Sequence, residues 1–262
     1  MNVVSVMAHQ DDELMCLGTL LKMRERGDTL HFICITDGSG GMAQAPDMPR
    51  NEAAAVRERE MRELTSRIGA TYQCLNEQDE YLYDTPELRL RLLQAVRTVK
   101  ADVIFTHFNP DYNVDHMTTN LLVRQVAMHA TFPMTHTEAT PLAKTPAVFL
   151  IEPSSGFEFE PTHYVDITAQ IELKRELARC HISQDQAFHV ALNKGLDDWI
   201  CETSAYRGSQ VDVPHAEGFR PMYSRGLIKP FAILPYTAEP IISTSAARTR
   251  PSAPGANGAG WL

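Results

Sequence analysis

The stretch VSVMAHQDDELM (residues 4–15) brings one imidazole and three carboxylates together directly after an apolar run. These side chains belong to His9, Asp11, Asp12 and Glu13. Two like charges about 4 Å apart repel by about 4 kcal/mol at an effective dielectric constant of about 20. The turn lacks the G-x-G-x-x-G pattern of a dinucleotide site, and its carboxylates would repel a phosphate. A divalent cation removes the repulsion, so the cluster predicts a metal site.

A second polar cluster, FNPDYNVDHMTTN, follows another apolar run, ADVIFTH (101–107), and contains Asp115 and His116. His9, Asp12 and His116 form a set of two histidines and one carboxylate. This is the ligand count of a catalytic zinc that keeps a fourth position open. Zinc would lower the pKa of a bound water to about 7. Asp11 lies beside these ligands and would remove the proton from that water.

A simpler interpretation explains single aspartates in these clusters. Asp11 or Asp12 is a good N-cap for a helix that starts at Glu13, and Asp115 could cap the helix that contains His116. Capping does not explain a histidine beside two adjacent acids together with a second Asp-His pair after another strand. We therefore favour the metal site.

The order of the elements predicts how the two clusters meet. Short apolar runs typical of strands occupy residues 2–8, 29–36, 70–75, 101–107 and 146–152. Helical periodicity between them predicts an α/β fold with a doubly wound (Rossmann-like), mostly parallel sheet and helices on both faces. In the common order 3-2-1-4-5, strands 1 and 4 are neighbours, and ligands bind where their carboxyl ends meet. We expect the metal site at the C-terminal ends of these strands.

The length of 262 residues fits one large domain. We expect a single catalytic domain over residues 1–235 and a disordered tail over 236–262, which is rich in Ser, Ala, Thr, Pro and Gly. A helix is expected over 168–180. The loop 37–51 is rich in Gly and Pro but lacks the lysine of a P-loop, so we expect a mobile active-site loop.

The composition excludes several classes of protein. A formal net charge of −9 disfavours nucleic acid as a partner. The sequence has no run of 18 apolar residues, so we expect no membrane span. It has no basic N-terminal segment, so we expect no signal peptide. The five cysteines form no C-x-x-C pair, which is typical of reduced thiols in the cytoplasm. We expect a cytoplasmic protein with a small-molecule substrate, and the oligomeric state, homo-oligomer included, stays open.

The motifs AHQDDE (8–13) and PDYNVDH (110–116) resemble the LmbE/PIG-L family of zinc-dependent N-deacetylases, usually written AHPDDE and H-x-D-H. The resemblance runs from about residue 2 to residue 235. The resemblance implies removal of acetyl groups from amino sugars, as by an N-acetylglucosaminyl deacetylase. Later segments that support it are EAAAVREREMRELTSRIGA (52–70), VDIT (165–168), LKRELARCHISQ (173–184) and AEGFR (216–220).

The resemblance also implies roles for individual residues. His9, Asp12 and His116 match the zinc ligands, although other divalent metals remain open. Asp11 matches the general base. Asp115 matches a catalytic acid that supports the second motif without binding the metal.

Two residues depart from the family pattern. Gln10 stands where proline is usual, and we expect little effect because that proline does no chemistry. Asn113 stands at the first histidine of H-x-D-H, which stabilises the oxyanion or protonates the amine. Asparagine can donate a hydrogen bond but delivers no proton at neutral pH. We favour Asp11 as both base and acid, with His163 or His215 as the alternative acid.

Three further residues are candidates for substrate binding, each with a plainer alternative. Arg57 matches a family position near the site, but a solvated helix charge fits its sequence context equally well. Asp111 and Tyr112 contact the substrate or only shape the turn after Pro110. His107 ends a strand and points toward the site, where it either supports the metal ligands or is a plain strand-end histidine.

We therefore expect a zinc-dependent hydrolase that removes an N-acyl group, most simply acetyl, from an amino sugar or a metabolite that contains one. Two alternatives stay open. One is an amidase that acts on a thiol conjugate or an acylated amino acid. The other is a metal- or sugar-binding homologue without catalysis, although such a protein has no use for the free carboxylate of Asp11.

Overall fold

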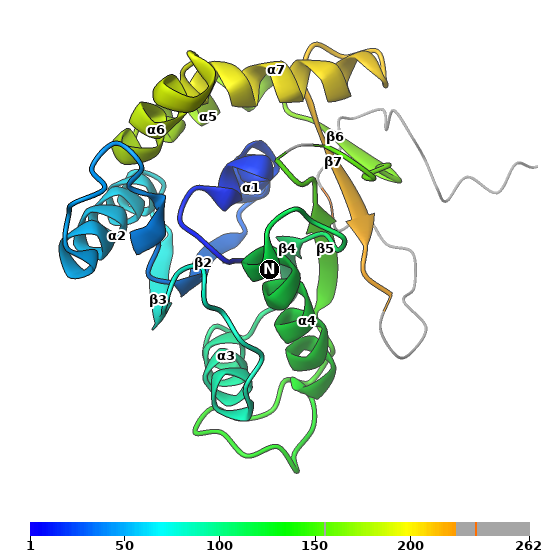
Figure 1. Cartoon of the computed structure of the whole chain (residues 1–262). Helices are drawn as coiled ribbons and strands as arrows, with labels where there is room; N and C mark the ends of the chain where they lie inside the picture. The colour runs from blue at the N-terminus through cyan, green and yellow to red at the C-terminus, as the bar shows by residue number, and fades with distance from the viewer. Residues whose placement is uncertain (155, 224–233, 235–262) are drawn as a thin grey trace, which may run out of the picture.

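The structure is a computed structural model that describes residues 1–154, 156–223 and 234. Seven strands of these residues form one sheet in the order β3-β2-β1-β4-β5-β7-β6 (Figure 1). Its strands are β1 (Asn2–Met7), β2 (Thr29–Thr36), β3 (Thr71–Glu77), β4 (Val103–His107), β5 (Ala147–Ile151), β6 (His163–Asp166) and β7 (Ala216–Pro221). Strands β1 to β5 are parallel, and β7 runs antiparallel to both β5 and β6.

Helices cover both faces of the sheet (Figure 1). Helices α3 and α4 pack on one face, and α1, α2, α5 and α7 pack on the other. The helices are α1 (Leu17–Glu25), α2 (Arg50–Arg67), α3 (Pro86–Thr98), α4 (Val114–His129), α5 (Ile171–Ala178), α6 (Ile182–Leu192) and α7 (Leu196–Ser209). Short 3₁₀ helices are η1 (Asp12–Met15), η2 (Ser39–Gly41) and η3 (Thr168–Gln170).

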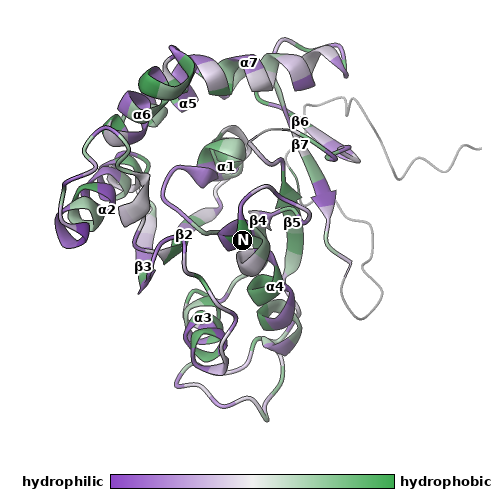
Figure 2. Ribbon diagram, viewed as in Figure 1, coloured by the Kyte–Doolittle hydropathy of each residue, from purple (hydrophilic) through white to green (hydrophobic). Residues whose placement is uncertain are grey.

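The predicted α/β fold and the central order 3-2-1-4-5 are confirmed. The central strands lie between two layers of helices, so both of their faces are buried and apolar, as the hydrophobic colouring of β5 illustrates (Figure 2). Thr85 is the N-cap of α3, because its hydroxyl accepts a hydrogen bond of 3.2 Å from the Leu88 amide.

Three features differ from the sequence-based expectation. The helix after β1 starts as η1, and α1 begins only at Leu17. The antiparallel pair β6 and β7 extends the sheet, and helix α6 was not predicted. The expected tail, residues 236–262, lies outside the described residues.

The register of the sheet positions the two polar clusters. Val3 pairs with Val103 and Ser5 pairs with Phe105, so β1 and β4 are direct neighbours that run in the same direction. Their carboxyl ends therefore deliver His9 and His107 to the same edge. Among the described residues, no helix is both long and apolar enough to span a membrane.

Candidate active site

The turn after β1 holds Asp11 in an unusual backbone conformation. Its φ of 109° is positive, which costs a residue with a side chain about 1–3 kcal/mol. The Asp11 amide donates a 2.9 Å hydrogen bond to Glu13 Oε2, and a charge-assisted bond of this kind helps to offset the cost. The Asp11 side chain makes no capping hydrogen bond to η1. Capping therefore does not explain Asp11.

Donor atoms of three residues form a triangle at the meeting point of β1 and α4, to which Asp12 contributes both carboxylate oxygens. His9 Nδ1 lies 3.3 Å from His116 Nε2 and 3.3 Å from Asp12 Oδ2. Asp12 Oδ1 lies 3.2 Å from His116 Nε2. Donors bound at 2.0–2.1 Å to a tetrahedral zinc lie about 3.4 Å apart. The three predicted metal ligands therefore have the spacing that such an ion requires.

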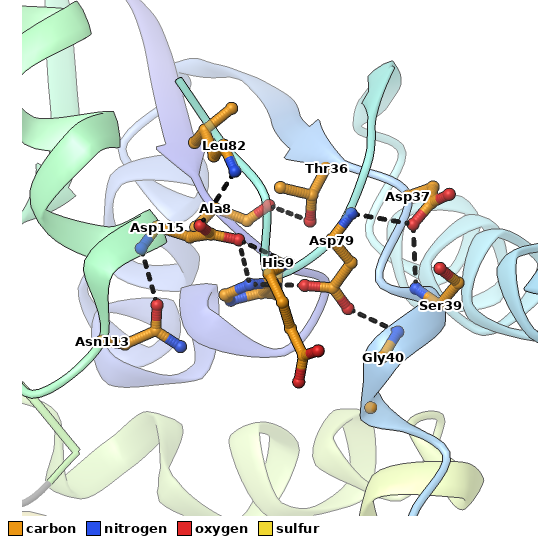
Figure 3. A network of polar contacts seen from close by, with 12 residues as sticks. Ala8, His9, Thr36, Asp37, Ser39, Gly40, Asp79, Leu82, Asn113 and Asp115 are labelled. Atoms are coloured by element: carbon orange, nitrogen blue, oxygen red, sulfur yellow. Dashed lines mark hydrogen bonds and ion pairs between the residues drawn. The ribbon is translucent and has the colours of Figure 1, made fainter. Parts of the chain in front are cut away.

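The opposite nitrogen of each histidine faces a carboxylate, as is typical of metal-binding histidines. His9 Nε2 lies 3.0 Å from Asp79 Oδ1 and 3.5 Å from Asp115 Oδ2 (Figure 3). His116 Nδ1 lies 3.1 Å from Oδ1 of Asp111, whose side chain is fully buried. These contacts orient each ring so that its other nitrogen points into the triangle.

Two polar side chains next to the triangle, those of His107 and Asp115, are held by other hydrogen bonds. His107 Nε2 accepts a 2.9 Å hydrogen bond from the Ala8 amide, so its lone pair is already used. Burial and the His116 ring lower the pKa of His107 to about 4, which keeps it neutral. Asp115 accepts hydrogen bonds from the amides of Glu80 and Leu82 at 2.8 and 3.2 Å. The carboxylate of Asp115 therefore lies outside the triangle, in contact with His9 and with the segment after Asp79, and its catalytic role stays a prediction.

The triangle attracts positive charge. Burial would lower the pKa of His9, but hydrogen bonds with Asp115, Asp12 and Asp79 raise it well above its usual value. Burial likewise opposes the carboxylates around His116, yet they raise its pKa to about 9. Desolvation would raise the pKa of Asp12, but His116 and His107 lower it well below its usual range. The carboxylates around the triangle therefore favour bound positive charge.

Asp11 lies outside the triangle and beside a buried cation. Arg57 is only 2% exposed, and its guanidinium lies 3.2 Å from Asp11 Oδ1 and donates to the Gln10 carbonyl oxygen. Burial raises the pKa of Asp11 to about 6, although Arg57 opposes the rise. The alternative of a solvated helix charge for Arg57 is therefore wrong.

Asn113 is the N-cap of α4. Its Oδ1 accepts a hydrogen bond of 2.8 Å from the Asp115 amide (Figure 3) and one of 3.4 Å from the His116 amide. This capping assigns the oxygen of the amide and leaves the Nδ2 group to point away from the helix. Asn113 therefore offers the donor that the sequence analysis expected for an oxyanion.

A cavity of about 240 Å³ opens over these groups. Asp11, Arg57 and Asn113 line it together with the metal triangle. Tyr112 also lines it, with an exposed ring whose edge faces His116. Asp111 is not among the lining residues, and its role in substrate binding stays a prediction. Further lining residues come from η2 and from the α6–α7 region, namely Gly40, Gly41, Gln184, Phe188, Leu196 and Trp199.

Sequence reasoning missed several residues of the site. Asp79 follows β3, and the rule that predicted the convergence of β1 and β4 applies to that strand end as well. Glu13 and His181 were also missed. They form a fully buried pair in which His181 Nε2 and Glu13 Oε1 are 2.8 Å apart. No local pattern links these two positions. The histidines proposed as alternative acids, His163 and His215, do not line the cavity.

Comparison with known proteins gives relatives over most of the chain. Residues 4–127 match the family described as PIG-L, GlcNAc-PI de-N-acetylase. A probable N-acetyl-alpha-D-glucosaminyl L-malate deacetylase 2 of Bacillus anthracis is 28% identical over 213 residues. That match covers 77% of this chain and 89% of the relative.

Two solved structures share the fold. The N,N'-diacetylchitobiose deacetylase from Pyrococcus horikoshii has a TM-score of 0.73 and 24% identity, covering 84% of this chain and 83% of its own. A 4-carboxy-2-hydroxymuconate hydratase from Pseudomonas putida has a TM-score of 0.74 and 20% identity, covering 88% and 99%. Because these neighbours are named for different reactions, the fold alone does not decide the chemistry.

Proposed function

We propose that the chain is a metal-dependent N-deacetylase of the PIG-L family, whose match over residues 4–127 includes both halves of the metal triangle. In this proposal it hydrolyses the amide of an N-acetylated amino sugar, with zinc bound by His9, Asp12 and His116. One observation carries the proposal. A triangle of donors with zinc-like spacing lies beside the carboxylate of Asp11, which makes no capping hydrogen bond and contacts Arg57.

A divalent ion at this site would polarise the acyl carbonyl and lower the pKa of a water. The residues of the chain then perform the proton transfers. Asp11 accepts the proton of the attacking water as the new carbon–oxygen bond forms. It returns that proton to the nitrogen as the carbon–nitrogen bond breaks, which gives acetate and a free amine. Asn113 Nδ2 donates a hydrogen bond to the carbonyl oxygen as negative charge develops there.

Arg57 holds Asp11 in place and lies in the cavity wall, where it can also bind a substrate hydroxyl. Tyr112 also lines the cavity and belongs to the proposed substrate side, whereas Asp111 holds the His116 ring and does not line the cavity. The cavity of about 240 Å³ suits one sugar ring with its acetamido group. The relatives named as deacetylases of glucosaminyl malate and diacetylchitobiose support this class of substrate.

The experiment is an acetate-release screen on the protein as purified, after chelation, and after zinc is restored. The panel holds N-acetylglucosamine, an N-acetylglucosaminide, diacetylchitobiose, an N-acetyl amino acid and an acylated thiol conjugate. We expect acetate from a sugar, loss on chelation and recovery with zinc. Asp12→Ala is the matched control that cannot be restored. If the zinc-bound protein releases no acetate from any of the sugars, the proposal is overturned. Turnover of 4-carboxy-2-hydroxymuconate would indicate hydration instead.

We further propose one catalytic domain over residues 1–235 in the cytoplasm. Strands β6 and β7 follow β5 in the chain and belong to the same sheet as β1, which supports one domain. All five cysteines are free thiols, as a reducing compartment favours.

A further inference from the structure

The carboxylate of Glu13 connects Asp11 to a buried histidine on another element. Its Oε2 accepts the Asp11 amide at 2.9 Å, and its Oε1 contacts His181 Nε2 at 2.8 Å. His181 is the N-cap residue of α6 and is fully buried. The contact spans most of the chain, since residues 13 and 181 are 168 positions apart. The backbone of Asp11 is therefore held by a residue from the C-terminal third.

The chemistry of the pair fixes the proton. A carboxylate accepts hydrogen bonds only, so the shared proton belongs to His181 Nε2. His181 Nδ1 has no hydrogen-bond partner among the described residues. Glu13 then faces one donor on each oxygen, the imidazole and the Asp11 amide. Removing the imidazole leaves a buried carboxylate with one donor lost, and Glu13 then turns or draws in water.

The segment that carries His181 is itself anchored. The Ser183 amide and hydroxyl donate to the two oxygens of Glu60 at 2.8 and 2.6 Å. Gln184 Nε2 donates to the Gly41 carbonyl at 2.8 Å. The start of α6 is therefore fixed to α2 and to η2, and His181 presents its ring to Glu13 from a rigid position.

We propose that His181 is a positioning residue for the general base, and that it acts through Glu13 on the positive-φ backbone of Asp11. The inference rests on the proposed role of Asp11 as the base. A shift of about 1 Å in a reacting group can cost about a hundredfold in rate. Helix α6, which His181 caps, contributes no residue to the metal triangle.

The test compares His181→Ala with His181→Gln, whose amide can still donate to Glu13. We expect His181→Ala to lower kcat by about 10- to 100-fold with little change in KM. We expect His181→Gln to recover most of that loss. Zinc content stays at the wild-type level in both variants, because the three ligands are untouched. Equal kcat in His181→Ala and the wild type would overturn the proposal.

A second measurement does not depend on turnover. The Asp11 amide, held by Glu13, should exchange slowly with solvent, and His181→Ala should speed its exchange at least tenfold. The matched control is Lys174→Met. Lys174 donates to Glu217 at 2.8 Å, and Glu217 accepts the amides of Gly18 and Thr19, so this buried pair has the same design away from the cavity. The control should leave the exchange of the Asp11 amide unchanged, and equal exchange in all three proteins contradicts the proposal.

A double-mutant cycle separates this inference from the proposed function. If His181 acts only through Asp11, then His181→Ala costs nothing more in an Asp11→Asn background. If the losses of kcat in the two single variants multiply in the double variant, His181 has a general structural role. That result would overturn this inference but not the proposed function. An Asp11→Asn enzyme with wild-type turnover would instead overturn the proposed function itself.

Discussion

Asp11 and Asp12 are chemically identical neighbours that the fold uses in different ways. His116 and His107 lower the pKa of the Asp12 carboxyl group, whereas burial raises the pKa of Asp11. The positive φ of Asp11 turns the two side chains apart at one peptide. One aspartate therefore serves the cation and the other remains free for proton transfer.

The first prediction concerns Asp11→Asn. The amide keeps the size of the side chain but cannot accept the proton of water, so kcat should fall by about 10²–10⁴-fold. Zinc content should stay at the wild-type level because Asp11 is not a ligand. Steady-state kinetics and elemental analysis of the same sample check both statements. A variant that loses zinc as well would place Asp11 among the ligands.

Asn113 has two roles that one pair of variants can separate. Asn113→Asp keeps the oxygen that caps α4 but removes the Nδ2 donor, so kcat should fall by about 10²–10³-fold with little loss of stability. Asn113→Ala removes both groups and should also lower the free energy of unfolding by about 1 kcal/mol. Thermal unfolding and kcat measured on both variants test this division. Wild-type kcat in Asn113→Asp would leave Asn113 as a cap alone.

The loop between β2 and η2 depends on a glycine that closes over Gln10. Gly38 has a φ of +67°, and a Cβ atom there would lie 2.1 Å from Gln10 Oε1 and 3.1 Å from Arg57 Nε. Gln10 is fully buried and donates to the Thr36 carbonyl and the Tyr72 hydroxyl. The glutamine that replaces the usual proline is therefore part of the support under this loop.

The third prediction follows from this close approach. Gly38→Ala combines a left-handed backbone, which costs about 1–2 kcal/mol, with a direct clash. It should destabilise the protein beyond that amount and raise KM, because the loop lines the cavity. Gly69→Ala is the matched control, since Gly69 has a φ of +65° but no atom near its missing Cβ. It should cost only the backbone term, as denaturant unfolding would measure, and equal losses in both variants would refute the clash.

A helix or strand could be predicted where the interactions that form it lie between residues close together in the sequence. Strand β2 matched its predicted range because its apolar run ends at a loop rich in glycine. Helix α6 was missed because it exposes Ile182, Val190 and Leu192, so its apolar pattern does not mark a buried face. The start of α1 was misplaced because the turn at Asp11 depends on hydrogen bonds that no local pattern encodes.

The same limit applies to the residues of the site. The metal ligands came from residue types at two strand ends, and the parallel sheet guarantees that such ends converge. The pairing of Glu13 with His181 depends on the path of the chain after β5, where the periodicity weakens. Tertiary packing alone brings that histidine to the turn.

At the scale of the whole molecule, the metal triangle joins two elements that are far apart in sequence. His9 and Asp12 follow β1, and His116 belongs to α4, so an ion would link the turn of one strand to the helix after another. The unfolded chain cannot hold these three ligands at their spacing. Metal binding therefore favours the folded state by mass action.

The last prediction states how much a bound zinc ion stabilises the folded chain. Free zinc at about 1,000 times its dissociation constant should add about 4 kcal/mol to the free energy of unfolding. For a chain of this size that corresponds to a rise in Tm of about 8–16 °C. Asp12→Ala should abolish the rise, whereas Asp11→Asn and His163→Ala should keep it, because neither residue belongs to the triangle. Calorimetry with and without zinc measures it for all four proteins. A rise that survives in Asp12→Ala would place the ion elsewhere, since a bound cation stabilises only through the groups that hold it.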